Sequence, residues 1–171
     1  MNQQYLDEYF STVWRSNLNQ YTYSGWALID QIQPWEMVLD VGCGFNEFKP
    51  HIQNLIGVDP ANDAADYKMP IEFYRPEFHF DVAFCLGSIN FGSEINIANQ
   101  ITHVVTLMKP RSRIYWRCNP GLKDHGNEEC KDIEFYPWTI AKQAEFAEMF
   151  GYRLALACWD TNNRIYAEWV R

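Results

Sequence analysis

The sequence lacks any apolar run near the ~20 residues that a helix needs to cross a bilayer, and its first ten residues, MNQQYLDEYF, contain neither a basic nor an apolar segment. We therefore expect neither a membrane-embedded segment nor a secretory leader. The five cysteines include no Cys-x-x-Cys pair, which indicates buried free thiols rather than a disulfide framework. Reduced thiols in a cytoplasmic protein are the expectation that follows.

Basic residues are also scarce, because Lys and Arg total 14 against 22 Asp and Glu, for a net charge of −8. Such a chain is repelled by phosphate backbones and anionic membranes, so nucleic-acid substrates are disfavoured. The basic residues that do cluster in sequence are Lys109, Arg111, Arg113 and Arg117. We interpret them as solvated charge near a sheet edge.

The length of 171 residues suits one domain with a buried core and is too short for a cofactor domain plus a full substrate domain. We expect a single domain over 1–171, with an N-terminal helical cap over 1–34 and a core over 35–171. Apolar residues recur at helical spacing over 3–15, and a second helix is predicted to stop before Pro34.

Short apolar runs predict the strands of a mostly parallel sheet. The predicted parallel strands are Met37–Val41, Leu55–Val58, a weaker one near Ile71–Tyr74, Phe80–Leu86 and Ile114–Cys118. The polar turn DTNN joins Tyr152–Trp159 to Arg164–Val170 as an antiparallel hairpin. This pattern predicts an α/β fold: a Rossmann-like, doubly wound sheet of seven strands, abbreviated around the third, with a reversed C-terminal hairpin strand and helices on both faces.

Three helical segments connect the predicted strands. A short helix is expected between the first two strands, and a longer one over Ile95–Met108. Thr139 is the expected N-cap of a third helix, which Gly151 ends. The predicted inward face of this third helix is Ile140, Ala144, Ala147 and Phe150.

The segment Val38–Pro60 contains the first strand, a glycine-rich turn, the second strand and an acidic residue after that strand. Gly42 and Gly44 permit a tight turn and the close approach of a ligand to backbone amides. Asp59 lies 19 positions after Asp40, near the spacing at which a doubly wound sheet places a carboxylate on a ribose 2′-hydroxyl. The segment therefore predicts a site for a nucleoside cofactor.

The dinucleotide pattern G-x-G-x-x-G lacks its third glycine here, because that position is Glu47. A carboxylate at this point repels a pyrophosphate and attracts a cation. The sequence therefore disfavours NAD and FAD. It favours S-adenosylmethionine, which carries an ammonium and a sulfonium and no phosphate, and which would place positive charge near Asp40 and Glu47.

Five segments resemble motifs of class I S-adenosylmethionine-dependent methyltransferases, and the resemblance covers roughly 38–171. They are LDVGCGFNEF, GVDP, FDVAFCLGSINF, LMKPRSRIYW and FYPWT. The resemblance implies that the first wraps the methionine part of the cofactor, that Asp59 in the second holds both ribose hydroxyls, and that the third passes the methyl end. The cofactor-binding residues that we expect are Asp40, Gly42, Cys43, Gly44, Glu47, Asp59, Pro60, Leu86 and Gly87.

The chain departs from the family pattern at three points. Asn46 replaces the usual third glycine, and the turn is expected to survive because asparagine tolerates left-handed backbone. The region after Asp59 is short, which leaves the adenine contact to Asp66 or Tyr67. Pro110-Arg111-Ser112 replaces the usual Pro-Gly-Gly before the fifth strand.

Residues that would act on a methyl acceptor are weakly marked. Asn90 either orients the acceptor or caps local backbone in its loop, and His125 is either a general base or a solvated loop histidine. Tyr21, Tyr23 and Trp26 either form an aromatic lid over a small substrate or fill the core. No histidine has a spaced metal partner, so we predict no metal site.

These features favour a methyltransferase that uses S-adenosylmethionine, releases S-adenosylhomocysteine and acts on a small molecule, or on an exposed group of a macromolecule brought by a protein partner. The loop after Phe80–Leu86 lacks an Asn/Asp-Pro-Pro-aromatic tetrapeptide, which further disfavours DNA. The alternative is a non-catalytic S-adenosylmethionine-binding or scaffold subunit of a methyltransferase complex, because the catalytic candidates are weak. An NAD-binding Rossmann protein is favoured less.

Overall fold

The computed structural model describes residues 3–15, 25–121 and 130–171. The described part contains one six-stranded sheet in the order β2-β1-β3-β4-β6-β5. Its strands are β1 (Val38–Val41), β2 (Leu55–Val58), β3 (Phe80–Leu86), β4 (Met108–Cys118), β5 (Arg153–Trp159) and β6 (Ile165–Val170). Strands β1 to β4 run parallel, and β6 runs antiparallel to β4 and β5. The predicted mostly parallel sheet with a reversed hairpin strand is confirmed in abbreviated form.

The weak third strand predicted near Ile71–Tyr74 is wrong. Ile71–Phe73 forms a single 3-10 turn, and Pro70 and Pro76 lie on either side of it. Proline has no N–H for a sheet ladder, so this segment is poorly suited to extend β2. Within the described chain, the outer edge of β2 carries an isolated bridge between Val58 and Tyr67 instead of a full strand.

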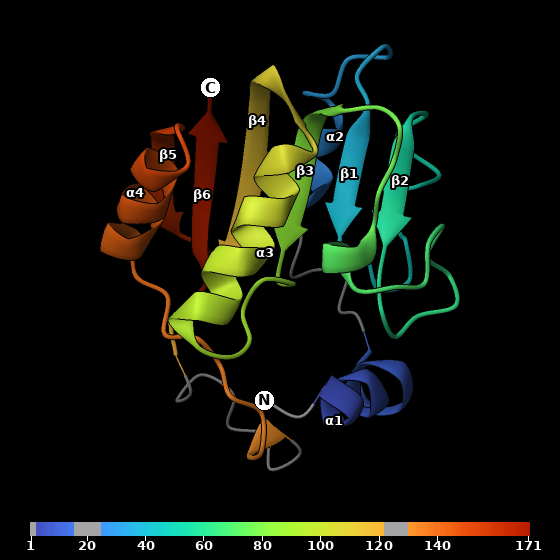
Figure 1. Cartoon of the computed structure of the whole chain (residues 1–171), viewed down its shortest axis with the longest axis vertical. Helices are drawn as coiled ribbons and strands as arrows, with labels where there is room; N and C mark the ends of the chain where they lie inside the picture. Colours follow the sequence, from blue (N-terminus) through green and yellow to red (C-terminus); the bar gives the residue numbers. More distant parts are fainter. Residues whose placement is uncertain (1–2, 16–24, 122–129) are drawn as a thin grey trace.

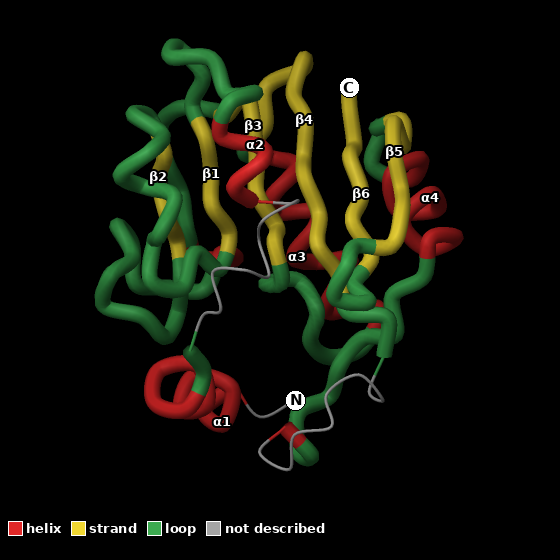
Figure 2. Tube along the Cα trace, turned by 180° about the vertical axis from the view of Figure 1, so that it is seen from behind, coloured by secondary structure: helices red, strands yellow, loops and turns green. Residues whose placement is uncertain are grey.

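Helices cover both faces of the sheet, as predicted. The described α-helices are α1 (Gln3–Glu8), α2 (Ala27–Ile29), α3 (Glu94–Thr106) and α4 (Ile140–Met149). A π-helical turn, Tyr9–Val13, continues α1. Figure 1 shows α3 and α4 in front of the sheet, and Figure 2 shows α2 on the opposite face.

Turns replace the short helix that we predicted between β1 and β2. Asn46 N donates to Cys43 O at 2.9 Å and Lys49 N donates to Asn46 O at 3.1 Å, which is the spacing of tight turns rather than of an α-helix. Asn46 itself is left-handed, with φ of 57°. Left-handed backbone interrupts a right-handed helix, and the turn survives with asparagine in place of glycine, as expected.

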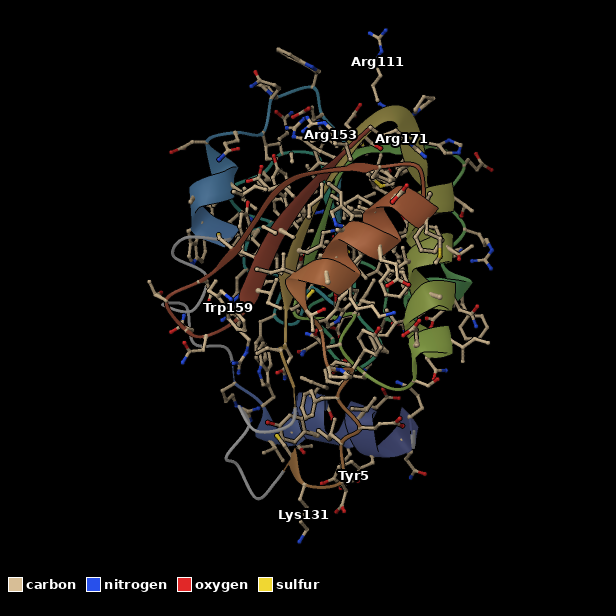
Figure 3. The ribbon with its side chains drawn as sticks, turned by 90° about the vertical axis from the view of Figure 1, so that its left-hand side faces the viewer. Tyr5, Arg111, Lys131, Arg153, Trp159 and Arg171 are labelled. Atoms are coloured by element: carbon tan, nitrogen blue, oxygen red, sulfur yellow. The ribbon has the colours of Figure 1, made fainter. Side chains whose placement is uncertain are left out.

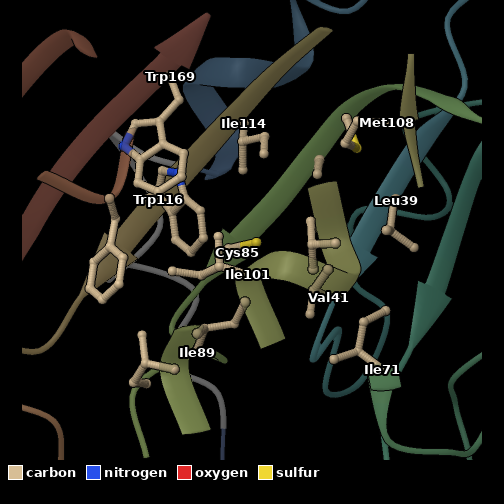
Figure 4. Close-up of a cluster of buried hydrophobic side chains, with 14 of the residues drawn as sticks. Leu39, Val41, Ile71, Cys85, Ile89, Ile101, Met108, Ile114, Trp116 and Trp169 are labelled. Atoms are coloured by element: carbon tan, nitrogen blue, oxygen red, sulfur yellow. The ribbon is translucent and has the colours of Figure 1, made fainter. Parts of the chain in front are cut away.

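The larger hydrophobic core lies between the sheet and helices α3 and α4 (Figure 4). Trp116 on β4 and Trp169 on β6 are fully buried in it, with ring centroids 4.5 Å apart. The Trp169 indole N–H donates to Gln143 Oε1 of α4 at 2.8 Å. A buried indole N–H needs an acceptor, which explains why α4 buries a glutamine.

The buried face of helix α4 overlaps only in part with the one predicted. Its buried residues are Gln143, Phe146 and Ala147. Ala147 was predicted correctly and the partly buried Phe150 packs against the core, whereas Ile140 and Ala144 are exposed. Hydrophobic periodicity missed part of this face because its central residue is polar.

A second apolar cluster packs α2 against the other face of the sheet. Leu28 of α2 joins Phe48 and Phe84 in this cluster. Trp26 packs edge-on against Phe48, with ring centroids 4.9 Å apart. Trp26 therefore contributes to the core on this face, which is the packing role that the sequence left open.

Replacing Thr139 by alanine is expected to lower the free energy of unfolding by about 1 kcal/mol. The Thr139 hydroxyl oxygen accepts from Lys142 N at 3.0 Å and caps the first turn of α4. Thr139→Ser keeps the hydroxyl and is the matched control. Urea denaturation of the three proteins measures the effect, and equal stability of the alanine and serine variants would contradict the capping role.

The carboxyl ends of β1 to β4 lie at one edge of the sheet, and α1 lies beyond that edge (Figures 1 and 2). In Figure 3, Tyr5 and Lys131 mark this end of the molecule, whereas Arg111, Arg153 and Arg171 mark the opposite end. Loops at the carboxyl edge are where open α/β sheets bind their ligands. The fold therefore directs attention to the space between this edge and α1.

Candidate functional site

A cavity of about 350 Å³ lies at the carboxyl edge of the sheet, where the strand order reverses between β1 and β3. Its volume falls in the range of small-molecule sites. The predicted site residues that line it are Gly42, Gly44, Asp59, Pro60, Leu86, Gly87 and Asn90. A smaller adjoining hollow contains Asp40, Cys43 and Glu47. All the predicted cofactor-binding residues therefore lie at this edge of the sheet.

Asp59 joins the two loops that border the cavity. Its Oδ2 accepts from Gly44 N at 2.9 Å, and its Oδ1 accepts from Ala61 N at 2.8 Å and Asn62 N at 2.9 Å. A carboxylate offers about four acceptor positions, so these bonds leave capacity for a ligand hydroxyl. Asp59 thus holds the glycine turn after β1 against the loop after β2.

Gly42 is required at its position for two reasons. Its φ of +65° belongs to the left-handed region, and a Cβ built on it would lie 2.3 Å from Ser88 Cβ. The turn after β1 therefore packs directly on the loop after β3. This contact brings backbone from both sides of the strand-order reversal to the same wall of the cavity.

Asp40 is buried, and its pKa is raised to about 8, first by desolvation and then by the charges of Asp59 and Glu47. Because both of those carboxylates act on Asp40, the three acids gather at one end of the site. A cation placed there would lower the cost of ionising Asp40. The electrostatics therefore suit a positively charged ligand.

The raised pKa of Asp40 should make the free protein less stable as pH rises. Between the ordinary value of 3.8 and about 8, the folded state keeps a proton that the unfolded chain has released. The free energy of unfolding should therefore fall through this window, by up to about 1.4 kcal/mol per pH unit. Asp40→Asn cannot titrate and should remove this part of the slope.

Urea denaturation of both proteins from pH 5 to 9 tests this prediction. The stability of the asparagine variant relative to the parent should rise from pH 5 to about pH 8 and then level off, because only the parent loses stability to the proton that its folded state retains in this window. Parallel stability curves for the two proteins would show that Asp40 titrates normally.

Two polar groups in the cavity wall were missed by the sequence analysis. Asn62 Nδ2 and Ser88 Oγ are buried and have no hydrogen-bond partner within the described chain, and both residues line the cavity. A buried donor without a partner is costly, so such groups point to a ligand. Asn62 lies three residues after Asp59, the acid that follows β2, so its position could have been identified from the sequence.

Asn90 lines the cavity and also ties two loops together. Its Oδ1 accepts from Asn119 N at 2.9 Å, and Trp138 Nε1 donates to the neighbouring Ile89 O at 2.9 Å. The backbone that Asn90 binds lies 29 residues away, so it is not the local cap that we considered. Its side chain fixes the loop after β3 against the end of β4.

The two residues that were predicted to contact adenine, Asp66 and Tyr67, do not line the cavity. Asp66 Oδ2 accepts from Gly57 N at 2.8 Å and pairs with Lys49 Nζ at 3.0 Å, which is a structural role under β2. Tyr67 is exposed and packs its ring on Tyr74 at 4.8 Å. His125, Tyr21 and Tyr23 lie outside the described residues.

The N-terminal helical segment supplies the aromatic cover of the cavity. Its residues in the wall include Leu6, Tyr9, Phe10 and Trp14. The Trp14 ring lies parallel to the Phe45 ring, with ring centroids 5.8 Å apart. It would also contact a Cβ placed on Gly44. A lid from this region was predicted, but the described residues that form it come from the first helix.

The interpretation of Arg113 and Arg117 as solvated charges is wrong. Strand β4 is central in the sheet, and Arg113 pairs with Glu36 through two bonds of 2.6 and 2.8 Å. Arg117 is buried at the end of β4, pairs with Asp160 at 2.8 Å and lines the cavity. Sequence clustering did not reveal these roles, because the acids that pair with the arginines are distant in the chain.

Within the described ranges, no three His, Cys, Asp or Glu side chains are arranged to hold a metal ion. No helix in those ranges combines the length and the hydrophobicity needed to span a bilayer.

Comparison with known proteins identifies the fold. No family model and no curated protein matches the sequence. Among solved structures, 1,6-didemethyltoxoflavin-N1-methyltransferase of Burkholderia thailandensis, with S-adenosylhomocysteine bound, is similar at a TM-score of 0.74 and 13% identity, over 99% of this chain and 88% of that one. Magnesium protoporphyrin IX methyltransferase of Synechocystis PCC 6803 is similar at 0.69 and 16%, over 99% and 100%.

A third neighbour is solved with the Haloferax volcanii Trm112 methyltransferase activator, at a TM-score of 0.67 and 11% identity over 99% of this chain and 94% of that one. The chain therefore has the class I S-adenosylmethionine-dependent methyltransferase fold, with an abbreviated sheet. At these sequence identities, the structural similarity supports the fold but does not identify the substrate.

Proposed function

We propose that the protein is an S-adenosylmethionine-dependent methyltransferase that acts on a small molecule. The observation that carries the proposal is the carboxyl-edge cavity in which Asp59 braces the Gly44 turn beside the buried acid Asp40. Neighbours of the same fold were solved with S-adenosylmethionine or S-adenosylhomocysteine bound. These two lines of support are independent, because one rests on side chains and the other on backbone likeness.

The residues present fit this cofactor. Asp59 would accept from one ribose hydroxyl through its remaining acceptor position, and the buried Asn62 amide would donate to the adenine ring. Asp40 and Glu47 would face the ammonium of the methionine part. The same acids would repel the pyrophosphate of NAD or FAD, so the site disfavours dinucleotides.

When bound, S-adenosylmethionine supplies an electrophilic methyl group, which an acceptor atom takes while the carbon–sulfur electron pair leaves on sulfur. Positioning provides most of the acceleration in such a displacement. The chain contributes by holding the loop after β3 rigid through Asn90 and by covering the cavity with Phe10 and Trp14. The cover would exclude water from the reacting atoms.

A small acceptor is favoured because the cavity between the sheet edge and the N-terminal helical segment has the volume of a small-molecule site. Two of the neighbours are named for small-molecule substrates. The free cysteines agree with a reducing, cytoplasmic location. The net charge of −8 disfavours a nucleic-acid substrate.

A partner-dependent or non-catalytic cofactor-binding subunit is the second candidate. It is favoured by the neighbour solved with an activator protein and by the structural use of Asn90, whose side-chain oxygen already binds Asn119 N. Under this alternative the pocket still binds S-adenosylmethionine. The two candidates therefore differ in turnover and not in cofactor affinity.

Isothermal titration calorimetry with S-adenosylmethionine, S-adenosylhomocysteine and NAD tests the cofactor. Binding of both adenosyl compounds with no heat from NAD is expected, and the reverse pattern would refute the proposal. Incubation of the loaded protein with a metabolite extract, followed by detection of S-adenosylhomocysteine, tests for catalysis. Binding without turnover would favour the non-catalytic candidate.

A further inference from the structure

We propose that the hydroxyl group of Ser88 binds the carboxylate of the amino-acid part of S-adenosylmethionine. The proposal rests on the proposed function, because it assigns one more residue of the same site to the same cofactor. The amino-acid part carries an ammonium and a carboxylate on one carbon. Asp40 and Glu47 in the smaller hollow attract the ammonium but repel the carboxylate, which therefore needs a donor of its own.

Ser88 lies where the cavity and the smaller hollow adjoin. Trp14, Gly42 and Leu86 line both spaces. Ser88 lines the cavity and lies two residues after Leu86. It also packs against Gly42 so closely that a Cβ built on the glycine would lie 2.3 Å from Ser88 Cβ. A ligand that enters both spaces would therefore pass next to Ser88.

The Ser88 hydroxyl is buried and has no hydrogen-bond partner within the described chain. A buried hydroxyl without a partner destabilises the free protein. The closeness of Gly42 explains why residue 88 is small, but alanine would occupy nearly the same space without this cost. A ligand that accepts from the hydroxyl explains why the residue is a serine.

The backbone amides of the glycine turn are already bound within the protein. Gly42 N and Cys43 N both donate to Val58 O, at 2.7 and 3.3 Å. Gly44 N donates to Asp59 Oδ2 at 2.9 Å. These three amides hold the turn against the end of β2 and the acid that follows it. The carboxylate of the cofactor therefore needs a donor from another element.

The loop that carries Ser88 is anchored directly after this residue. Ile89 is buried in the larger core (Figure 4), and its carbonyl oxygen accepts from Trp138 Nε1 at 2.9 Å. Asn90 Oδ1 accepts from Asn119 N at 2.9 Å. Rotation about the single χ1 torsion of Ser88 then directs the hydroxyl, so little entropy is lost when it binds a ligand.

A neutral donor fits this position better than a basic side chain would. The ammonium of the cofactor depends on the negative field of the nearby acids, and a lysine or arginine beside them would weaken that field. A hydroxyl leaves the field intact and still forms a charge-assisted hydrogen bond to a carboxylate. Ser88 and the acids can therefore bind the two opposite charges of one amino-acid group.

Calorimetry with two ligands that differ only in the carboxylate tests the inference. S-adenosylhomocysteine carries this group, and decarboxylated S-adenosylhomocysteine lacks it; competition titrations extend the measurement to weak binding. In Ser88→Ala we expect the affinity for S-adenosylhomocysteine to fall about ten- to a hundredfold, the scale of a hydrogen bond to a charged group. The affinity for the decarboxylated ligand should not change. An equal loss for both ligands, or no loss for either, would overturn the proposal.

Ser88→Cys separates the hydrogen bond from the volume of the side chain. A thiol fills the space of the hydroxyl but is a weak donor. This variant should therefore lose nearly as much affinity for S-adenosylhomocysteine as Ser88→Ala does. Parent-like affinity in Ser88→Cys would show that only packing matters at this position, and it would contradict the proposed contact.

The stability of the free protein gives a second readout, with Ser112→Ala as the matched control. Ser88→Ala should be at least as stable as the parent in urea denaturation, because it removes a buried hydroxyl that has no partner. The Ser112 hydroxyl bonds to Tyr152 Oη at 2.8 Å and lies outside the cavity lining. Ser112→Ala should therefore lose stability and keep both ligand affinities. A clear loss of stability in Ser88→Ala would show that its hydroxyl is bound within the protein and would refute the ligand role.

Failure of this inference is distinguishable from failure of the proposed function. If the parent binds S-adenosylhomocysteine and Ser88→Ala binds it equally well, the role of Ser88 is refuted and the cofactor assignment stands. Absence of S-adenosylhomocysteine binding in the parent protein would refute the proposed function itself.

Discussion

Replacing Gly42 by alanine is expected to lower the free energy of unfolding by about 2 to 5 kcal/mol and to abolish measurable binding of S-adenosylhomocysteine. The left-handed φ of +65° at this position costs an alanine about 1 to 2 kcal/mol. The added Cβ would also stand 2.3 Å from Ser88 Cβ. Relief of that overlap requires a backbone shift, which adds about 1 to 3 kcal/mol.

The shift affects binding because of where Ser88 lies. Gly42 belongs to the turn after β1 and Ser88 to the loop after β3, and both line the cavity. Moving them apart would displace the loop that carries Asn90 and the wall that faces the cofactor. A displacement of about 1 Å in a preorganised site is enough to cost a hundredfold in function.

Gly151→Ala is the control that separates strain from overlap. Gly151 has φ of +75°, and no atom lies within 4 Å of a Cβ built on it. It ends α4, far from the cavity lining, so its alanine variant should lose only the strain of about 1 to 2 kcal/mol and keep ligand affinity. Urea denaturation and calorimetry of both variants measure the two effects. Equal stability losses would show that the contact with Ser88 is unimportant.

The parts of the fold that sequence predicts well are those that depend on neighbouring residues. Strand β3 and the β5–β6 hairpin follow from unbroken apolar runs and a polar turn, which local physics determines. Asp59 and the glycines were located because the strand–turn–strand segment that holds them is continuous in the chain. The prediction of a third strand was wrong because Pro70 and Pro76 disfavour sheet hydrogen bonds in this segment, although its apolar residues suggested a strand.

The parts that sequence missed depend on distant contacts. Arg117 has its acid 43 residues away at Asp160, and Gln143 is buried because Trp169 requires an acceptor. Neither partnership has a local signature. Phe135 likewise joins the cavity wall only because its segment pairs with Phe91 across the chain. These long-range contacts are determined by the topology of the fold, so the sequence shows the residue types but not which residues come into contact.

Replacing Asp59 by alanine is expected to lower the free energy of unfolding by about 3 kcal/mol or more, since each buried N–H left without an acceptor costs about 1 to 3 kcal/mol. Three backbone N–H groups, those of Gly44, Ala61 and Asn62, donate to this carboxylate. Affinity for S-adenosylhomocysteine should fall by a further 1.5 to 3 kcal/mol, roughly the scale of a lost charge-assisted hydrogen bond to a ribose.

Asp59→Asn separates the structural role from the ligand role. The amide oxygen can keep the bonds to Ala61 N and Asn62 N, but the amide Nδ2 would then face Gly44 N, donor against donor. We expect a smaller loss of stability than in the alanine variant and nearly the same loss of affinity. The folded asparagine variant is therefore the one in which calorimetry gives the clearer answer.

Asp66→Asn is the matched control. Asp66 also accepts from a backbone N–H, that of Gly57, but it lies outside the cavity lining. Its asparagine variant should lose stability and keep the affinity of the parent. If Asp59→Asn also keeps that affinity, the carboxylate is only a brace between two loops, and the ribose contact must come from another residue.

The Asp59→Asn variant should also alter the titration of Asp40. Desolvation raises the pKa of Asp40 most, and the charge of Asp59 is the next cause. Neutralising Asp59 should therefore move the pKa of Asp40 down from about 8 while leaving it above the ordinary 3.8, because the burial remains. The fall in stability with rising pH should then end at a lower pH in Asp59→Asn than in the parent. An unchanged end point would place the two carboxylates too far apart to act as one cation-binding group.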